Sequence, residues 1–125
     1  MPGVDALTGR RVRLHPPAAS LAANWQIIMF EIEFTPEALD DLKALKKHGQ
    51  VQVVEAIETS LKHQPTEEAR SRKRLRPNAV AEWELRVGKF RILYNVDEQV
   101  HSVSIEAVGF KIGNLLFFRG RKREL

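Results

Sequence analysis

The sequence contains no cysteine, and none of its apolar runs approaches the length of a membrane span. Without cysteine the chain can form neither disulfide bonds nor thiolate metal sites, and this fits a reducing compartment such as the cytoplasm. A bilayer-spanning helix needs about 20 apolar residues, so we expect no membrane segment. The four histidines, at positions 15, 48, 63 and 101, lack the spacing of a metal site, and we expect neither a metal nor a cofactor.

The composition is that of a folded protein with an excess of positive charge. With 125 residues, the chain has room for one domain and one hydrophobic core. Hydrophobic residues make up 43% of it and charged residues 29%, which excludes a disordered chain. The formal net charge of +4 favours anionic partners, either a nucleic acid or an acidic protein.

Residues 1–28 differ from the rest, because Gly, Pro, Arg and Ala are mixed there without a helical or an alternating period. They also lack the apolar core of a secretory signal. Met29 then opens the regular pattern MFEIEF. We expect residues 1–28 to be a loosely ordered extension, or the natural start to be Met29, and residues 29–125 to form the folded domain.

A strand and two helices are predicted next. Apolar residues alternate with glutamate over positions 30–34, which is typical of a half-buried strand. Thr35-Pro36-Glu37 is a helix start, since it supplies a capping hydroxyl, a proline for the first helical position and a negative charge. Leucines recur at helical spacing up to a basic run that Gly49 closes, and a second amphipathic helix ends before Pro65. The short link at Gly49 predicts an antiparallel helical hairpin.

The second half of the chain carries the strand signals. Strands are predicted at 82–87, 90–96 and 100–108, and the apolar run 115–118 is predicted as a fifth strand, with a short helix as the alternative. The sequence therefore predicts an α+β fold, in which a small antiparallel sheet of four or five strands packs on an N-terminal helical hairpin.

The segment AEWELRVGKFRILYNV predicts a hairpin with a two-residue turn at Gly88-Lys89. This turn sets the cross-strand pairs Val87–Phe90, Arg86–Arg91, Leu85–Ile92, Glu84–Leu93 and Trp83–Tyr94. One face then receives the helices and carries Trp83, Leu85, Ile92 and Tyr94, which Val103, Ile105 and Ala107 of the next strand are expected to join. The other face, called the open face below, carries Glu82, Glu84, Arg86, Arg91 and Asn95.

Two groups of basic residues need an explanation. Like charges directly opposite each other destabilise a sheet, so either Glu84 and Glu106 neutralise Arg86 and Arg91, or the two arginines await an external anion. Residues 64–80 are also basic, and they are either a solvated loop or a phosphate- or partner-binding strip that Leu75 anchors to the fold.

The stretch from Phe30 to Val108 resembles the RelE/ParE superfamily of toxins from type II toxin–antitoxin systems. The motifs that carry the resemblance are EFTPEALDDLKAL, KRLRP and, above all, WELRVGKFRILYNVD. The resemblance implies a small antiparallel sheet backed by two helices, and an acidic antitoxin protein whose C-terminal segment wraps the toxin. Members of the RelE-like branch cut messenger RNA on the ribosome without a metal, and their basic groups stabilise the charge that develops on the phosphate.

Within that branch Arg91 matches the strand arginine of the ribonucleases, and Lys111 lies near a second basic position. Phe117 stands about where the ribonucleases have a tyrosine, and Glu82 and Glu84 stand where they tend to have lysines. We expect catalytic roles for Arg91, Arg86, Lys111 and Glu84, and RNA or partner binding by Arg72, Lys73, Arg74, Arg76, Lys89 and Arg119.

Three functions are compatible with these residues. The first is an mRNA interferase, in which Arg91 and Arg86 bind the scissile phosphate while Lys111 or a nearby carboxylate such as Glu84 assists proton transfer. The second is a ParE-like toxin that binds a protein such as DNA gyrase without cleaving RNA. The third is a non-toxic binding protein on the same fold.

Overall fold

A computed structural model describes residues 12–14, 29–119 and 121–123 of the chain. The prediction of a loosely ordered extension falls mostly on residues outside this part and stays a prediction, although residues 12–14 form a strand. In the part of the chain that the structure describes, no helix is long and apolar enough to cross a membrane.

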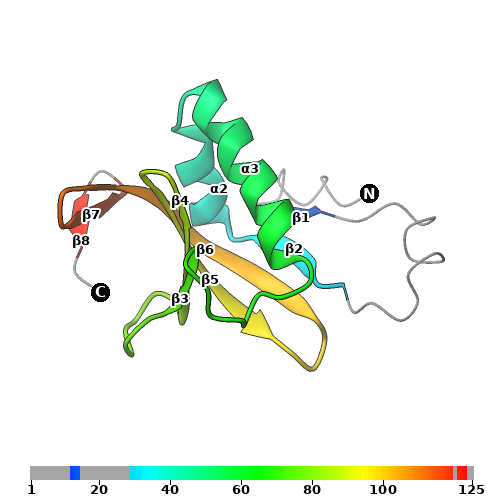
Figure 1. Cartoon of the computed structure of the whole chain (residues 1–125). Helices are drawn as coiled ribbons and strands as arrows, with labels where there is room; N and C mark the ends of the chain where they lie inside the picture. The colour runs from blue at the N-terminus through cyan, green and yellow to red at the C-terminus, as the bar shows by residue number, and fades with distance from the viewer. Residues whose placement is uncertain (1–11, 15–28, 120, 124–125) are drawn as a thin grey trace.

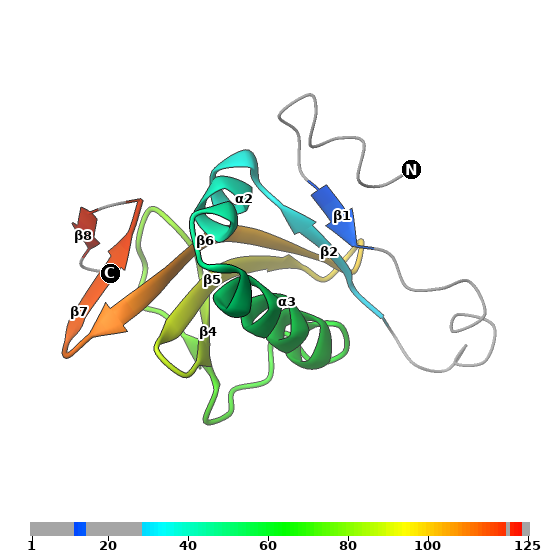
Figure 2. The same ribbon diagram turned by 90° about the horizontal axis from the view of Figure 1, so that it is seen from above.

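A single mixed sheet organises the described residues, with its strands in the order β1-β2-β6-β5-β4-β3 and with β7 and β8 added beside β6. The strands are β1 Val12–Leu14, β2 Glu31–Phe34, β3 Arg72–Arg74, β4 Trp83–Val87, β5 Phe90–Asp97, β6 Ser102–Ile112, β7 Leu115–Phe118 and β8 Arg121–Arg123. The helices α2 Pro36–Lys43 and α3 Lys47–Leu61 both lie over one face of this sheet (Figures 1 and 2). The predicted α+β class is confirmed, and the run 115–118 is a strand.

The sheet differs from the prediction in direction and in size. Strand β2 runs parallel to β6, so the sheet is mixed and not antiparallel throughout. The basic connection contributes β3, which pairs with β4 although its three residues are all charged. Strand β3 forms because its backbone pairs with the otherwise free edge of β4. The Arg86 N–H donates to the Ser71 carbonyl and the Leu75 N–H donates to the Glu82 carbonyl, both at 2.8 Å.

The first helix begins as predicted, but the two helices are divided at a different place. The Thr35 hydroxyl caps α2 by accepting a hydrogen bond from the Ala38 N–H at 3.1 Å. Helix α2 ends at Lys43, and α3 already begins at Lys47, so the predicted link at Gly49 was wrong. Gly49 lies inside α3, where an added Cβ would stand 2.9 Å from Cζ of Phe90. The glycine therefore allows α3 to approach the β4–β5 hairpin.

The main hydrophobic core fills the space between the helices and the sheet. Its central side chains are fully buried and come from every layer: Ile32, Val53, Ile57, Leu61, Ile92, Tyr94, Val103 and Ile105. The Tyr94 hydroxyl reaches the far side of this core and donates to the Pro65 carbonyl at 2.6 Å. Burial raises the pKa of Tyr94 well above its ordinary value.

The register of the β4–β5 hairpin is the predicted one in all five pairs. Gly88 has a φ of +57° at the first central position of the turn, as a type II′ turn requires. The helix-covered face therefore carries Trp83, Leu85, Ile92 and Tyr94, and the stacked rings of Trp83 and Tyr94 lie 6.3 Å apart.

A bulge in β6 overturns one part of the predicted core. Leu93 pairs with Ala107 but the next residue, Tyr94, pairs with Ile105, so Glu106 is an extra residue. Beyond a bulge the alternation of faces is inverted. Val108 therefore joins the helix-covered core, and Ala107, predicted there, lies on the open face instead.

The open face carries a second, smaller core that the sequence pattern did not predict. It consists of Ala81, Leu93, Ala107, Leu116 and Phe118, with Leu75 and Val80 packed against it. The signal in the sequence was the unbroken apolar triplet Ile92-Leu93-Tyr94, because a strand with one solvated face would have a polar residue at its centre.

Candidate functional site on the open face

Arg86 and Arg91 face each other across β4 and β5 on the open face. Arg86 is neutralised on its own strand, since its Nε donates to Oε1 of Glu84 at 2.9 Å. The Glu84 side chain is 9% exposed and that of Arg86 42% exposed, so the arginine covers the carboxylate. Glu106 takes no part, because the bulge directs its carboxylate to the Ser104 hydroxyl at 2.8 Å and the Asn95 amide at 3.3 Å.

Arg91 is held by backbone and not by a carboxylate. Its Nη1 donates to the carbonyls of Gly88 at 2.7 Å and Phe90 at 2.8 Å. Its Nε is buried and has no acceptor among the described residues. A guanidinium offers five N–H donors, so Arg91 retains positive charge and donor capacity that neighbouring carboxylates do not consume.

Two lysines extend this arrangement along the sheet. Lys73 of β3 is the cross-strand partner of Glu84. Gly109 is the partner of Arg91, and Lys111 follows two residues later on the same face of β6. We call Lys73, Glu84, Arg86, Arg91 and Lys111 the open-face strip; it crosses β3, β4, β5 and β6 and carries four positive charges and one negative.

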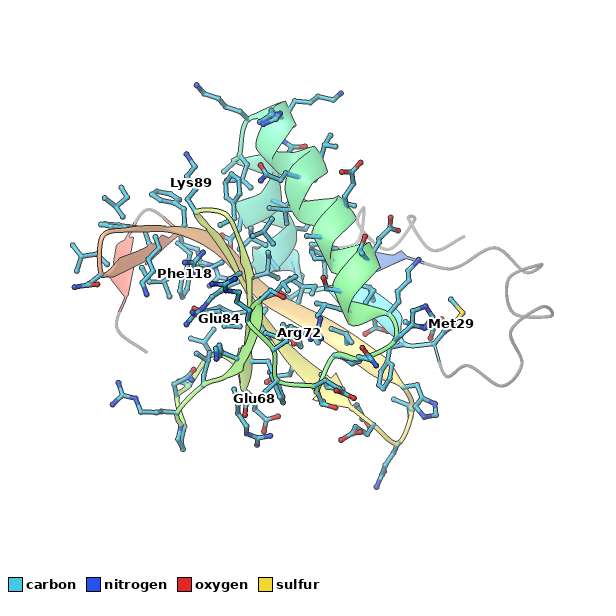
Figure 3. All side chains as sticks on the ribbon, viewed as in Figure 1. Met29, Glu68, Arg72, Glu84, Lys89 and Phe118 are labelled. Carbon is cyan, nitrogen blue, oxygen red and sulfur yellow. The ribbon has the colours of Figure 1, made fainter. Side chains whose placement is uncertain are left out.

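The other predicted binding residues do not join the strip. Arg72 and Arg74 pair with Leu85 and Trp83, so alternation turns them to the opposite side of β3 from Lys73. Figure 3 shows Arg72 and Glu84 on opposite sides of this ribbon. Arg72 donates from Nε to the Glu67 carbonyl at 2.9 Å, and the Arg74 guanidinium lies 5.7 Å from the Trp83 ring.

Arg76 and Lys89 are exposed, the first in a loop and the second in a turn. Arg76 lies in the loop after β3, which Asn78 organises by accepting hydrogen bonds from the Val80 and Ala81 N–H groups at 2.8 and 3.0 Å. Lys89 lies in the hairpin turn, with its Nζ 5.6 Å from the Phe90 ring. This contact directs Lys89 toward the helix-covered face, to which Phe90 belongs, and not into the strip.

Arg119 has a structural role and is not part of the strip. Between the end of the β2 pairing at Ile105 and the start of the β7 pairing at Phe110, the edge of β6 has no strand beside it. Asp41 of α2 accepts the Val108 N–H there at 3.1 Å, and Arg119 donates to the Glu106 carbonyl at 2.7 Å while lying 3.4 Å from Asp41.

Asp41 is a structural residue that sequence reasoning missed. Burial raises the pKa of its carboxyl above the ordinary value, more than the Val108 hydrogen bond and the Arg119 charge lower it. Its signal was an aspartate beside Leu42 on the apolar side of a helix, where a charge needs a partner. The Asp41–Arg119 pair bridges the break in the sheet.

Phe117, which the resemblance puts about where the ribonucleases have a tyrosine, faces the helix side. Its ring stacks on that of Phe110 with centroids 5.7 Å apart, and Phe110 packs against the main core. Arg91 lies on the opposite face, so this position supplies neither a hydroxyl nor a ring to the strip. Within the described ranges, no group of three or more histidine, aspartate or glutamate side chains is placed to hold a metal ion.

Comparison with known proteins identifies the family to which this fold belongs. The family model for the ParE toxin of the type II toxin–antitoxin system parDE matches residues 32–109. A chain of the toxin–antitoxin complex RelBE2 from Mycobacterium tuberculosis is 28% identical and superposes with a TM-score of 0.58, over 68% of this chain and 100% of that one. A search of curated proteins found no match. Because the family model covers more than half of the sequence, the chain belongs to the ParE toxin family of type II toxin–antitoxin systems.

Proposed function

We propose that this toxin is neutralised by an acidic antitoxin and that it acts by binding a protein target through the open-face strip, without cutting RNA. The carrying observation is the Arg86–Glu84 ion pair at 2.9 Å. A general acid or base must reach the proton that it transfers. Glu84 is buried beneath its arginine, so its carboxylate is occupied and shielded.

The residues around this pair also favour binding over cleavage. Phe117 has no hydroxyl and stacks on the helix side. Lys73, Arg91 and Lys111 supply positive charge for the carboxylates of a partner surface. The family resemblance makes DNA gyrase the first target to test.

A second candidate function is a metal-independent mRNA endoribonuclease, and Arg91 is the observation that favours it. Arg91 lies opposite Arg86 and near Lys111 on one face, and it is not bound to a carboxylate among its recorded contacts. Preorganised cations of this kind stabilise a pentavalent phosphate. Under this reading Arg86 and Arg91 bind the phosphate of a messenger RNA, on the ribosome or free, and Lys111 moves the proton.

Induction of the full chain in a bacterial host separates the two. We expect growth arrest with an SOS response and intact transcripts. Transcripts cut within minutes, mapped by primer extension, together with rapid translation arrest would refute the binding proposal and support the ribonuclease. Normal growth would refute both and leave a binding protein without toxicity.

Matched variants assign the activity to the strip. Arg91→Ala should abolish arrest because it removes the cation that no carboxylate neutralises, and Arg91→Lys should retain part of it. Arg70→Ala is the control, since Arg70 is exposed and outside the strip. Full toxicity of a folded Arg91→Ala protein would remove the strip from the mechanism.

A further inference from the structure

A hollow lies on the open face, at the end of the sheet away from the open-face strip. It has a volume of about 540 Å³ and is formed by β2, β5, β6 and the β5–β6 turn. Figure 1 shows this turn at the opposite end of the sheet from the β6–β7 hairpin. No lysine or arginine of the described residues lines the hollow, but four carboxylates do: Glu31, Glu33, Asp97 and Glu106. We call it the acidic hollow.

Asp97 and Glu106 have only neutral hydrogen-bond donors as partners among the described residues. Oδ1 of Asp97 accepts hydrogen bonds from two backbone N–H groups of the β5–β6 turn, at 3.0 and 3.3 Å. Oε2 of Glu106 accepts hydrogen bonds from the Ser104 hydroxyl at 2.8 Å and from the Asn95 amide at 3.3 Å. These donors fix the position of each carboxylate and leave its negative charge available to a cation from outside.

The two sides of the acidic hollow differ. On the side of β2, the register of β1 sets Arg13 opposite Glu33. On the side of the β5–β6 turn, Val100 is 66% exposed and lines the hollow together with Asp97. A lysine or arginine buries its apolar stem along apolar surface while its charged group stays polar. The turn side therefore suits a basic side chain of a partner, with its stem on Val100 and its charge on Asp97.

The open face thus carries opposite charges at its two ends. The open-face strip has four positive charges and one negative, and the acidic hollow is negative. Arg91 lies near the start of β5 and Asp97 at its end, so about 20 Å of strand separates the two ends. The buried cluster around Leu93 and Phe118 lies between them. A partner that covers the whole face must therefore carry acidic groups at one end and basic groups at the other.

This distribution favours a protein over a nucleic acid as that partner. A nucleic acid carries negative phosphates along its entire length. A strand that followed β5 from Arg91 would therefore be repelled by Asp97 and Glu106. A folded protein can present both signs of charge on one surface, about 20 Å apart.

We infer that the target of this toxin is a protein with a bipolar surface, whose acidic patch binds the open-face strip while one of its lysines or arginines enters the acidic hollow. The cation lies against Asp97 and Glu106. The inference rests on the proposed function and adds a second contact site to it. Two contacts of opposite sign fix the orientation of the partner and reject partners that carry one sign only.

The test removes the charge of the acidic hollow and keeps its hydrogen bonds. In the full chain, Asp97→Asn with Glu106→Gln retains a side-chain oxygen at each position to accept the recorded hydrogen bonds. We expect the amount of toxin that halves the growth rate of a bacterial host, quantified by immunoblot, to rise about tenfold, because target affinity falls. A thermal melt verifies the fold, and Asp97→Asn alone repeats the test at an exposed position.

Two controls accompany this hollow variant. Glu55→Gln with Glu58→Gln changes the net charge by the same amount at exposed positions of α3 on the other face, and should leave growth arrest unchanged. Fluorescence anisotropy with a single-stranded oligouridine measures the affinity for a polyanion. The hollow variant should bind this RNA at least as tightly as the unmodified chain, because the loss of two negative charges favours any polyanion.

The outcomes separate this inference from the proposed function. Equal arrest by the hollow variant and the unmodified chain, with transcripts intact in both, refutes the acidic hollow as a contact site and leaves the proposed function standing. Arrest weakened equally in the hollow variant and the α3 control assigns the effect to net charge and also refutes it. Stronger arrest by the hollow variant, with tighter oligouridine binding and cut transcripts, refutes both and assigns the open face to a nucleic acid.

Discussion

One face of the sheet lies under α2 and α3, and the other has no helix over it in the described part of the chain; the two bury their side chains differently. The helix-covered face buries a continuous layer that reaches from Phe30 to Val108. The open face buries a small cluster around Leu93 and Phe118, and beside it a charged strip held by an ion pair and by backbone carbonyls.

The main hydrophobic core and the proposed binding strip therefore lie on opposite faces of one sheet. Side chains between helices and sheet can be exchanged only for others of the same volume, because the core is close-packed. The recorded contacts of Arg86 and Arg91 are polar, an ion pair with Glu84 and hydrogen bonds to two backbone carbonyls. Mutations that probe the two faces should therefore differ in kind as well as in size.

The largest expected effect comes from a matched pair of leucines on neighbouring strands. Leu85 is 1% exposed under the helices, and Leu93 is 0% exposed on the open face. Leu85→Ala should lower the free energy of unfolding by about 4 kcal/mol and Leu93→Ala by about 2.5 kcal/mol, because the smaller cluster includes loop residues that can close the cavity. Urea denaturation measures both. Equal losses would show that the open-face cluster is packed as tightly as the main core.

Two glycines lie where neighbouring elements approach closely, one on each face of the sheet. A Cβ on Gly109 would meet the Phe117 carbonyl oxygen and stand 2.8 Å from Cβ of Phe118, so Gly109→Ala must displace β7 and should cost about 2 kcal/mol. Gly49→Ala meets only the end of the Phe90 ring and gains about 1 kcal/mol of helix propensity, so its net cost should be smaller. Thermal melts compare the two. A larger loss for Gly49→Ala would contradict this assignment.

The ion pair of the open face should matter more than one on a helix surface. Arg86→Met leaves the buried Glu84 without its partner and should cost about 1 kcal/mol. Lys62→Met breaks the looser 3.6 Å pair with Glu58 on α3 and should change stability by less than about 0.5 kcal/mol. Equal effects in chemical denaturation would mean that Arg86 is free to bind an anion without loss of stability.

The smallest expected effect is a pH dependence of the free energy of unfolding that comes from Asp41. The pKa of Asp41 is higher in the folded chain than its ordinary value of 3.8, so the folded state binds more protons in the pH window just above that value. The contribution of Asp41 to stability is therefore fully present below that window and is lost as pH rises through it.

Asp41→Asn removes this titration while its side-chain oxygen can still accept the Val108 N–H. The free-energy difference between the original chain and the variant, measured by urea denaturation from pH 3.5 to pH 7, should fall as pH rises. A difference that rises with pH would mean that Arg119 lowers the pKa of Asp41 more than burial raises it.

Much of the fold was predictable because its signals are local. The Gly88-Lys89 turn and the alternation on either side determine the register of β4 and β5, since a shift by one residue would expose Trp83 and Tyr94. The opposition of Arg86 and Arg91 follows from the same register. The cap at Thr35 depends on three consecutive residues.

The partners of those arginines were not predictable, because they depend on backbone irregularity. Glu84 and Glu106 were together the expected neutralising carboxylates, with an external anion as the alternative. The bulge turns Glu106 away from the two arginines and inverts which residues of β6 face the helices beyond it. No side-chain pattern in the sequence marks Glu106 as the extra residue. Strand β3 was missed for a related reason, since it is held by the edge of β4 and not by its own side chains.

The sequence by itself determined the α+β class, the central hairpin and the charged composition of its open face, because these depend on residues that are near neighbours in the chain. The tertiary structure decided which of those charges are neutralised, how β7 joins the sheet and which residues face each other beyond the bulge. These depend on contacts between distant positions, such as Asp41 with Arg119 and Gly49 with Phe90, which no local pattern specifies.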